Sequence, residues 1–237
     1  MKVALFVPCY VRAVSPQVAE ACLKLLRHLG VDAEIPDSQT CCGQPMANAG
    51  YEADTAALKR RFEKIFESYD TIVGPSSSCV TFVRDHYGDA FKGRIWEICE
   101  YLHDVVKPTA LPGRFPHKVS LHNSCHGVRM MGLSSPSEQN IPYYNKLRDL
   151  LSLIDGIEVV ESERPDECCG FGGLFSVEES AISVKMGQDR VQRHLATGAE
   201  YITAADSSCL MHQAGIIAAE KLPIKTLHIT EILACGL

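Results

Sequence analysis

Two sets of four cysteines recur in the same order along this chain. Each set has a single cysteine, then the tripeptide Cys-Cys-Gly, then another single cysteine, with gaps of 31 and 36 residues in the first set and 42 and 39 in the second. Thiolates are soft ligands, and four of them complete the protein ligands of an iron–sulfur cluster. The pattern predicts thiolate-bound metal on eight candidate ligands: Cys9, Cys41, Cys42, Cys79, Cys125, Cys168, Cys169 and Cys209.

The sequence around the cysteines repeats as well. Residues 2–9 resemble residues 118–125, and residues 71–79 match residues 201–209. The offset between the copies is 116 at the first cysteine, 127 at the Cys-Cys pair and 130 at the last cysteine. This pattern predicts an internal duplication.

We expect a first cysteine-rich domain over residues 1–115 and a second over residues 116–237, with an insertion in the second copy at residues 134–144. Each half is long enough to bury its own core. The formal charge of −6 and the lack of a basic run argue against nucleic acid as a partner. Without a signal peptide or an apolar run of membrane-spanning length, a cytoplasmic protein is expected.

Strand-like and helix-like segments alternate in both halves, which is typical of an α/β fold with parallel sheets covered on both faces. The expected strands are residues 2–7, 31–35, 71–73, 119–122, 157–160 and 201–203. The expected helices are residues 16–29, 52–69, 79–87, 143–153, 176–197 and 209–220. Ligands of such sheets bind at the carboxyl ends of the strands. Cys9, Cys79, Cys125 and Cys209 all fall there, so we expect a site in each half.

Three further cysteines, Cys22, Cys99 and Cys235, have no counterpart in the repeat. The odd total of eleven in a long chain without an export signal favours reduced thiols over disulfides. We interpret these three as ordinary buried residues.

The two cysteine sets, with Cys-Cys-Gly-Gln-Pro at residues 41–45 and Cys-Cys-Gly-Phe-Gly-Gly at residues 168–173, resemble the duplicated CCG domain of heterodisulfide reductase and of the glycolate oxidase iron–sulfur subunit. In length and motifs the chain is similar to the lactate utilization protein A family. The resemblance implies a non-flavin electron-transfer subunit of an oxidoreductase complex that oxidises L-lactate. It also implies one or two 4Fe-4S clusters per chain, and as partners a ferredoxin-like iron–sulfur subunit and a third small subunit.

One departure concerns the end of each copy, where the heterodisulfide reductase pattern has Cys-x-x-Cys. Here Phe82 and His212 stand at the position of the last cysteine. Four cysteines per half suit an ordinary 4Fe-4S cluster, and heterodisulfide chemistry does not carry over. His212 is either a fifth ligand or a packed side chain.

His122 and His126 flank Cys125, and they either tune a cluster and relay protons or serve the structure. Arg12, Arg129 and Lys185 are candidates for binding a carboxylate, or else are solvated. No catalytic residue is assigned.

Two other function classes stay open. One is a thiol–disulfide oxidoreductase that uses the adjacent Cys pairs, although Cys-x-x-Cys is absent. The other is a zinc-stabilised binding module, although close zinc knuckles are lacking. No G-x-G-x-x-G motif follows the first strand, so nicotinamide binding of the familiar kind is not expected.

Overall fold

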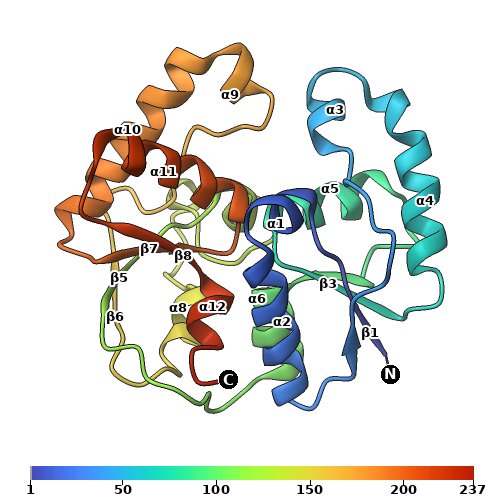
Figure 1. Ribbon diagram of the computed structural model, residues 1–237, viewed down its shortest axis with the longest axis horizontal. Coiled ribbons are helices and arrows are strands. Elements are labelled where there is room, and N and C mark those ends of the chain that lie inside the picture. Colours follow the sequence, from blue (N-terminus) through green and yellow to red (C-terminus); the bar gives the residue numbers. More distant parts are fainter. Residues whose placement is uncertain (1) are drawn as a thin grey trace.

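The computed structural model describes residues 2–237, and it contains two four-stranded parallel sheets side by side (Figure 1). The first sheet has the order β2-β1-β3-β4 and the second the order β6-β5-β7-β8, which is the same order in the second copy. The strands of the first sheet are β1 (Val3–Leu5), β2 (Ala33–Glu34), β3 (Thr71–Gly74) and β4 (Ile95–Glu97). Those of the second are β5 (Lys118–Leu121), β6 (Glu158–Glu161), β7 (Tyr201–Ala204) and β8 (Lys225–His228).

The strand register repeats between the copies. Leu5 pairs with Val73 in the first sheet, and Leu121 pairs with Thr203 in the second, at matching positions. Every neighbouring pair is parallel, so each connection must cross over the sheet, and helices supply these crossovers. The predicted α/β fold with two similar parallel-sheet halves is confirmed.

The helices alternate with the strands in both halves. The first half has α1 (Cys9–Val14), α2 (Pro16–His28), α3 (Gln44–Asn48), α4 (Ala56–Phe66), α5 (Ser77–His86) and α6 (Ile98–Tyr101), with a 3-10 turn at Glu52–Thr55 and a π-helix at Leu102–Val106. The second half has α7 (Cys125–Arg129), α8 (Lys146–Leu151), α9 (Phe175–Glu178), α10 (Ser180–Ala196), α11 (Ser207–Glu220) and α12 (Ile229–Leu233), with a 3-10 turn at Ser137–Gln139.

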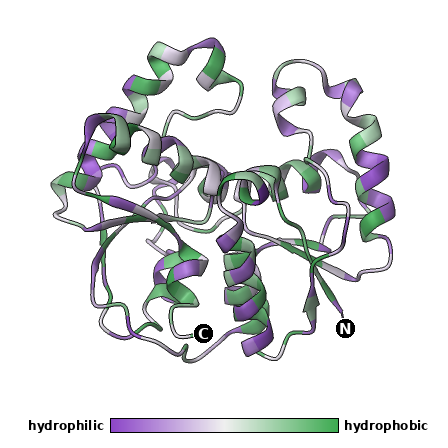
Figure 2. Ribbon diagram, in the orientation of Figure 1, coloured by the Kyte–Doolittle hydropathy of each residue, from purple (hydrophilic) through white to green (hydrophobic). Residues whose placement is uncertain are grey.

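Helix α2 shows how sequence sets these elements. Pro16 stands in its first turn, where the missing N–H costs nothing, and Gly30 adopts φ +78° just after its end. Its buried side chains include Val18, Cys22 and Leu25, which recur every three to four residues. Figure 2 shows the resulting mixture of hydrophobic and hydrophilic residues along this helix.

The halves share a core, which differs from the expectation that each half buries its own. The larger hydrophobic cluster runs from β1 through to α12, because α2 packs against α12 and α6 packs against α8. Leu26 and Leu233, one from each half, are both fully buried in it. A smaller cluster around Val191 and Ile202 belongs to the second half alone.

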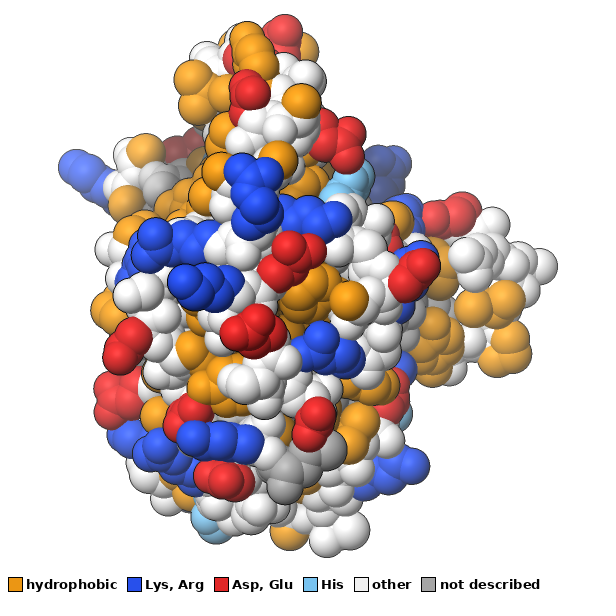
Figure 3. All heavy atoms as spheres, turned by 90° about the vertical axis from the view of Figure 1, so that its right-hand side faces the viewer, with side chains coloured by type: hydrophobic (Ala, Val, Ile, Leu, Met, Phe, Trp, Pro, Cys, Tyr) orange, Lys and Arg blue, Asp and Glu red, His pale blue; other side chains and the backbone are white. Residues whose placement is uncertain are grey.

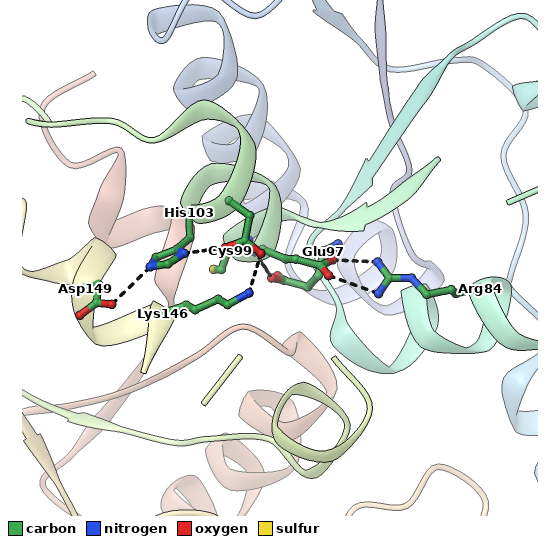
Figure 4. A network of polar contacts seen from close by, with 8 residues as sticks. Arg84, Glu97, Cys99, His103, Lys146 and Asp149 are labelled. Atoms are coloured by element: carbon green, nitrogen blue, oxygen red, sulfur yellow. Dashed lines mark hydrogen bonds and ion pairs between the residues drawn. The ribbon is translucent and has the colours of Figure 1, made fainter. Parts of the chain in front are cut away.

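Polar contacts also join the halves (Figure 4). Lys146 at the start of α8 donates to Asp104 at 2.5 Å, and His103 lies 3.3 Å from Asp149. Towards β4, Arg84 pairs with Glu100 at 2.8 Å. The boundary is therefore held by an apolar core with ion pairs beside it.

Several predicted elements need correction. The expected helix over 52–69 begins as a 3-10 turn and ends at Phe66, and the helix expected from Cys209 begins at Ser207, where Asp206 caps it. Cys22 and Cys99 are buried as predicted, but Cys235 is exposed because it follows α12 at the surface end of the chain. The predicted insertion lies in a loop closed by a bridge between Ser134 and Asn145.

The surface around α4, which faces the viewer in Figure 3, carries basic and acidic side chains interspersed. Within residues 2–237, every helix is too short or too polar to cross a bilayer.

Candidate metal centre

All eight predicted ligand cysteines line one cavity, which lies between the two halves. The sequence predicted a site in each half, and the structure brings both to the same place. The cavity wall includes Cys9, Cys41, Cys42, Cys79, Cys125, Cys168, Cys169 and Cys209. The space among these residues amounts to about 670 Å³, part of which is open to solvent.

The cysteines of the first set come from three segments that follow strand ends. Cys9 begins α1 after β1, and Cys79 lies in the first turn of α5 after β3. Cys41 and Cys42 stand in the loop before α3, and the Cys41 sulfur lies 3.7 Å from that of Cys9. The Tyr87 hydroxyl donates to the Cys42 carbonyl at 2.8 Å and fixes this loop.

The second set repeats this arrangement. Cys125 begins α7 after β5, and Cys209 lies in the first turn of α11 after β7. Cys168 and Cys169 stand in the loop before α9. The Nδ1 atom of His126 lies 3.7 Å from the Cys125 sulfur.

A glycine N–H supports one sulfur in each half. Gly43 donates to Cys41 Sγ at 3.3 Å, and Gly170 donates to Cys168 Sγ at 3.4 Å. Both glycines have positive φ, at +88° and +87°, so the sequence Cys-Cys-Gly meets a backbone requirement. Backbone donors of this kind favour an anionic sulfur.

The crowded thiols shift one another's pKa values. The pKa of Cys41 lies far below its usual value because the Cys42 and Cys9 thiols donate hydrogen bonds to its sulfur. In the second half, the Cys125 and Cys169 thiols lower the pKa of Cys168 in the same way. In each half the first cysteine of the Cys-Cys pair is thus the most acidic thiol of its set.

Two equivalent contacts, one from each copy, join the halves at the cavity. Tyr10 and His126 each follow the first cysteine of a set; Tyr10 packs edge-on against Phe171 at 5.6 Å, and His126 Nε2 lies 3.2 Å from Gln44 Nε2. Gln44 and Phe171 in turn occupy equivalent positions, each two residues after a Cys-Cys pair. The cavity is therefore enclosed by both copies through matching contacts.

His122 lies behind the second set, fully buried. One of its ring nitrogens lies within 4.8 Å of the sulfurs of Cys169 and Cys209. Its Nδ1 accepts a hydrogen bond from Arg190 Nε at 3.1 Å, and burial lowers the pKa of His122 to about 3, so the ring is neutral. His122 therefore lies next to the second cysteine set, with its Nδ1 already occupied by Arg190.

The other candidates are not among the residues that line the cavity. His212 is close to the carbonyl of Ser183, at 3.2 Å, as a packed side chain, and Phe82 is buried and stacked on His86. The three basic candidates bind the protein's own groups: Arg12 the Gln39 carbonyl, Arg129 Glu138 and Asp166, and Lys185 Asp189.

Two residues beside the site, Arg190 and Asp206, were not predicted from the sequence. Arg190 lies inside helix α10, where an arginine is usually solvated, and only the lack of an acid three or four residues away in the sequence could have marked it. Asp206 aligns with Ser76 in the repeat, and both are helix N-caps next to a ligand cysteine, so the alignment carried a signal for it.

The donor set fits a metal group. Each half offers four thiols, one glycine N–H on a sulfur and a helix that begins beside a cysteine. The buried His122 Nε2 has no hydrogen-bond partner within residues 2–237. Clustered soft donors with an unpaired polar atom behind them are typical of a site that binds thiolate-coordinated metal.

Comparison with known proteins agrees with this duplication. A family model described as a cysteine-rich domain, CCG, matches residues 3–84 and again residues 119–213. These two segments contain the first and second cysteine sets.

Full-length relatives carry a common name. The chain is 36% identical to lactate utilization protein A of an Exiguobacterium species, over 99% of this chain and 97% of that protein. It is 33% identical to lactate utilization protein A 2 of Bacillus cereus and 32% identical to lactate utilization protein A 1 of Bacillus anthracis, over 100% of this chain and 99% of each relative.

A solved structure of a hypothetical protein from Helicobacter pylori shares the fold, with a TM-score of 0.62 at 10% identity. The match covers 99% of this chain but 48% of that protein, so the chain spans about half its length. By its two CCG cysteine-rich segments and its full-length relatives, the chain belongs to the lactate utilization protein A family.

Proposed function

We propose that this protein is an iron–sulfur electron-transfer subunit of a system that oxidises L-lactate. The observation that carries the proposal is the convergence of eight thiols from two repeats on one cavity. A structural zinc site coordinates one ion with four ligands, whereas two complete sets of four cysteines on one cavity suit a pair of electron carriers.

In this proposal Cys9, Cys41, Cys42 and Cys79 hold one 4Fe-4S cluster, and the second set holds another: Cys125, Cys168, Cys169 and Cys209. A bound cluster supplies reversible one-electron chemistry. The protein's own part is to orient the sulfurs, to donate the N–H groups of Gly43 and Gly170, and to exclude water with the aromatic rings of Tyr10 and Phe171.

The lactate assignment is drawn from the names of the full-length relatives. A subunit of this kind needs an electron donor and an acceptor, and we propose a ferredoxin-like iron–sulfur subunit and a third small subunit as its partners. A cytoplasmic location is part of the proposal, since all eleven cysteines are free thiols and reduced thiols persist there.

A second candidate is thiol–disulfide chemistry, which the 3.7 Å separation of the Cys9 and Cys41 sulfurs favours. The two candidates differ in metal content. A thiol–disulfide enzyme would be colourless and would titrate as a dithiol, whereas an electron carrier would contain iron and acid-labile sulfide.

The deciding experiment measures iron, sulfide, zinc and the EPR spectrum of protein prepared and reconstituted without oxygen. We expect about eight iron atoms per chain for two 4Fe-4S clusters, reduced to about half by Cys42→Ser and equally by Cys169→Ser. Cys235→Ser, which alters an exposed thiol outside the cavity, is the matched control and should keep the full content. Protein with zinc alone or with no metal would overturn the proposal.

A further inference from the structure

Three buried positions differ in kind between the two copies. Phe6, Phe62 and Phe66 lie behind the first cysteine set, and the corresponding residues behind the second set are His122, Arg190 and His194. The offset of the first pair, 116, equals that of the first cysteines, and the offset of the other two pairs, 128, lies between those of the Cys-Cys pairs and of the last cysteines, 127 and 130. An apolar trio in the first half thus corresponds to a polar trio in the second.

The two trios have the same geometry. The Phe6 and His122 N–H groups donate to the carbonyls of Val73 and Thr203, each at 2.8 Å. The rings of Phe6 and Phe66 meet edge-on at 6.0 Å, and those of His122 and His194 at 5.8 Å. The positions are therefore structurally equivalent, and the two copies differ there in the polarity of the side chains.

Arg190 fixes the proton on His122. Its Nε–H donates to His122 Nδ1 at 3.1 Å, and a guanidinium has donors only. Nδ1 therefore carries the lone pair, and in a neutral ring the proton must be on Nε2. This is the nitrogen that has no partner among the described residues.

The same constraint decides between a ligand and a hydrogen-bond donor. A ligating Nε2 would need the proton on Nδ1, where it would face the Arg190 Nε–H. We propose that His122 donates its Nε2–H to sulfur of the second cysteine set, at Cys169 or Cys209, and thereby raises the reduction potential of the group held there above that of the first set. His122 is in this role a positioning and tuning residue, not a metal ligand.

Arg190 adds to the effect. It is fully buried, and its remaining N–H groups donate to Ser162 Oγ at 3.0 Å and to the carbonyls of Arg164 and Pro165 at 2.8 and 3.0 Å. These bonds hold the loop that leads to Cys168. A buried positive charge and a hydrogen bond to sulfur both favour the reduced, more negative state of a cluster.

The inference rests on the proposed function, because it concerns clusters in both sets. Its consequence is an order of potentials: the first set, backed by phenylalanines, is the low-potential site, and the second set is the high-potential site. Electrons would collect in the second half.

The test uses single-cluster proteins. Cys42→Ser leaves the second site alone, and Cys169→Ser leaves the first, so each potential is measured separately by EPR-monitored redox titration. In the Cys42→Ser protein, His122→Phe should lower the potential by at least a tenfold change in the reduction equilibrium, about 59 mV for one electron. His122→Gln, which keeps an N–H at the same reach, should recover most of it. In the Cys169→Ser protein, His122→Phe should change nothing.

An unchanged potential in the Cys42→Ser protein, equal shifts at both sites, or loss of the second site's iron in His122→Phe would each overturn the inference. If His122→Phe fails to fold because Arg190 is left without an acceptor, the double variant His122→Phe/Arg190→Phe reproduces the first-half pair and takes its place.

A readout that needs no iron separates this inference from the proposed function. In metal-free protein labelled with 15N-histidine, two-bond couplings should show His122 protonated at Nε2, and Cys169→Ser should move that signal. A proton on Nδ1 would overturn the inference even if both clusters assemble. If no iron binds, the proposed function fails, and the tautomer still decides the role of His122.

Discussion

Ser76 and Asp206, which occupy the same position in the two copies, form an antiparallel bridge across the boundary between the halves. Each caps the helix that carries the last cysteine of its set: Ser76 Oγ accepts from the Cys79 N–H at 3.3 Å, and Asp206 Oδ1 accepts from the Ser208 N–H at 3.1 Å. Asp206 Oδ2 also accepts from the Ser78 N–H of the other half, at 2.9 Å. One carboxylate therefore serves both helix starts.

Replacement of Asp206 should affect both sites at once. We expect Asp206→Ala to lower the free energy of unfolding by about 1–3 kcal/mol, since the buried Ser208 N–H and the partly buried Ser78 N–H lose their acceptor. Iron content should fall in both halves, measured in the Cys42→Ser and Cys169→Ser backgrounds. Ser76→Ala removes a cap in the first half only and is the control. The expectation fails if Ser76→Ala lowers the iron content of the second site more than Asp206→Ala does.

The two Cys-Cys-Gly glycines should differ in tolerance. A Cβ at Gly170 would lie 2.6 Å from Met186 Cβ and 2.8 Å from the Ser183 carbonyl oxygen, whereas the atom nearest to a Cβ at Gly43 would be Thr55 Cγ2, at 3.1 Å. An alanine at either position carries a strain of roughly 1–2 kcal/mol, because the backbone there is left-handed. Gly170→Ala should therefore cost clearly more stability in denaturant titration than Gly43→Ala, and equal losses would contradict the expected clash.

Glu97 should make stability fall with rising pH. Burial raises the pKa of this carboxyl to about 8, above its unfolded value, so the folded chain binds the extra proton between about pH 4.5 and 8. This contribution of Glu97 to the free energy of unfolding decreases with pH in this window, by at most about 1.4 kcal/mol per pH unit. The buried histidines His122 and His228, whose pKa values are lowered by burial, contribute in the opposite sense below about pH 6.5. Glu97→Gln keeps the acceptor for the Cys99 N–H and should remove only the contribution of Glu97, so the free energy of unfolding of the variant should rise relative to that of the wild type as the pH increases.

Urea titrations between pH 5 and pH 8 measure the slope for metal-free protein. Glu20→Gln, which neutralises an exposed carboxylate of α2, is the control and should retain the wild-type slope. A Glu97→Gln protein as pH-dependent as the wild type would show that Glu97 is not the group responsible.

The boundary ion pair should contribute to the docking of the halves. Lys146 is 18% exposed and its loss leaves Asp104 half-buried without its cation, so Lys146→Met should lower the free energy of unfolding by about 1–2 kcal/mol. Lys185→Met breaks an exposed pair with Asp189 within α10 and should cost at most about 0.5 kcal/mol. Thermal unfolding of both variants checks the difference, and equal losses would count against a role of Lys146 at the boundary.

Much of the fold could be predicted because it follows local rules. The spacing of apolar residues and the residues at their ends predict the buried strand Thr71–Gly74 and the amphipathic helix Pro16–His28. Short helices such as Cys9–Val14 were missed because six residues carry too little periodicity to distinguish them from a loop.

The candidate site was predicted only in part. The Cys-Cys-Gly repeat identifies all eight cavity cysteines, but their convergence depends on how α2 packs against α12, a long-range contact without a local signature. For the same reason His122 could be noticed beside Cys125, whereas its partner Arg190, 68 residues away, could not.

The pairing of equivalent residues across the boundary has a consequence for ancestry. Contacts such as the one between Ser76 and Asp206 are those that a symmetric dimer of identical single-copy chains makes with itself. In such a dimer the position of Phe6 and His122 would hold two phenylalanines or two histidines. A chain that holds both copies is free of that restriction, so it can carry two unlike environments around a shared cavity.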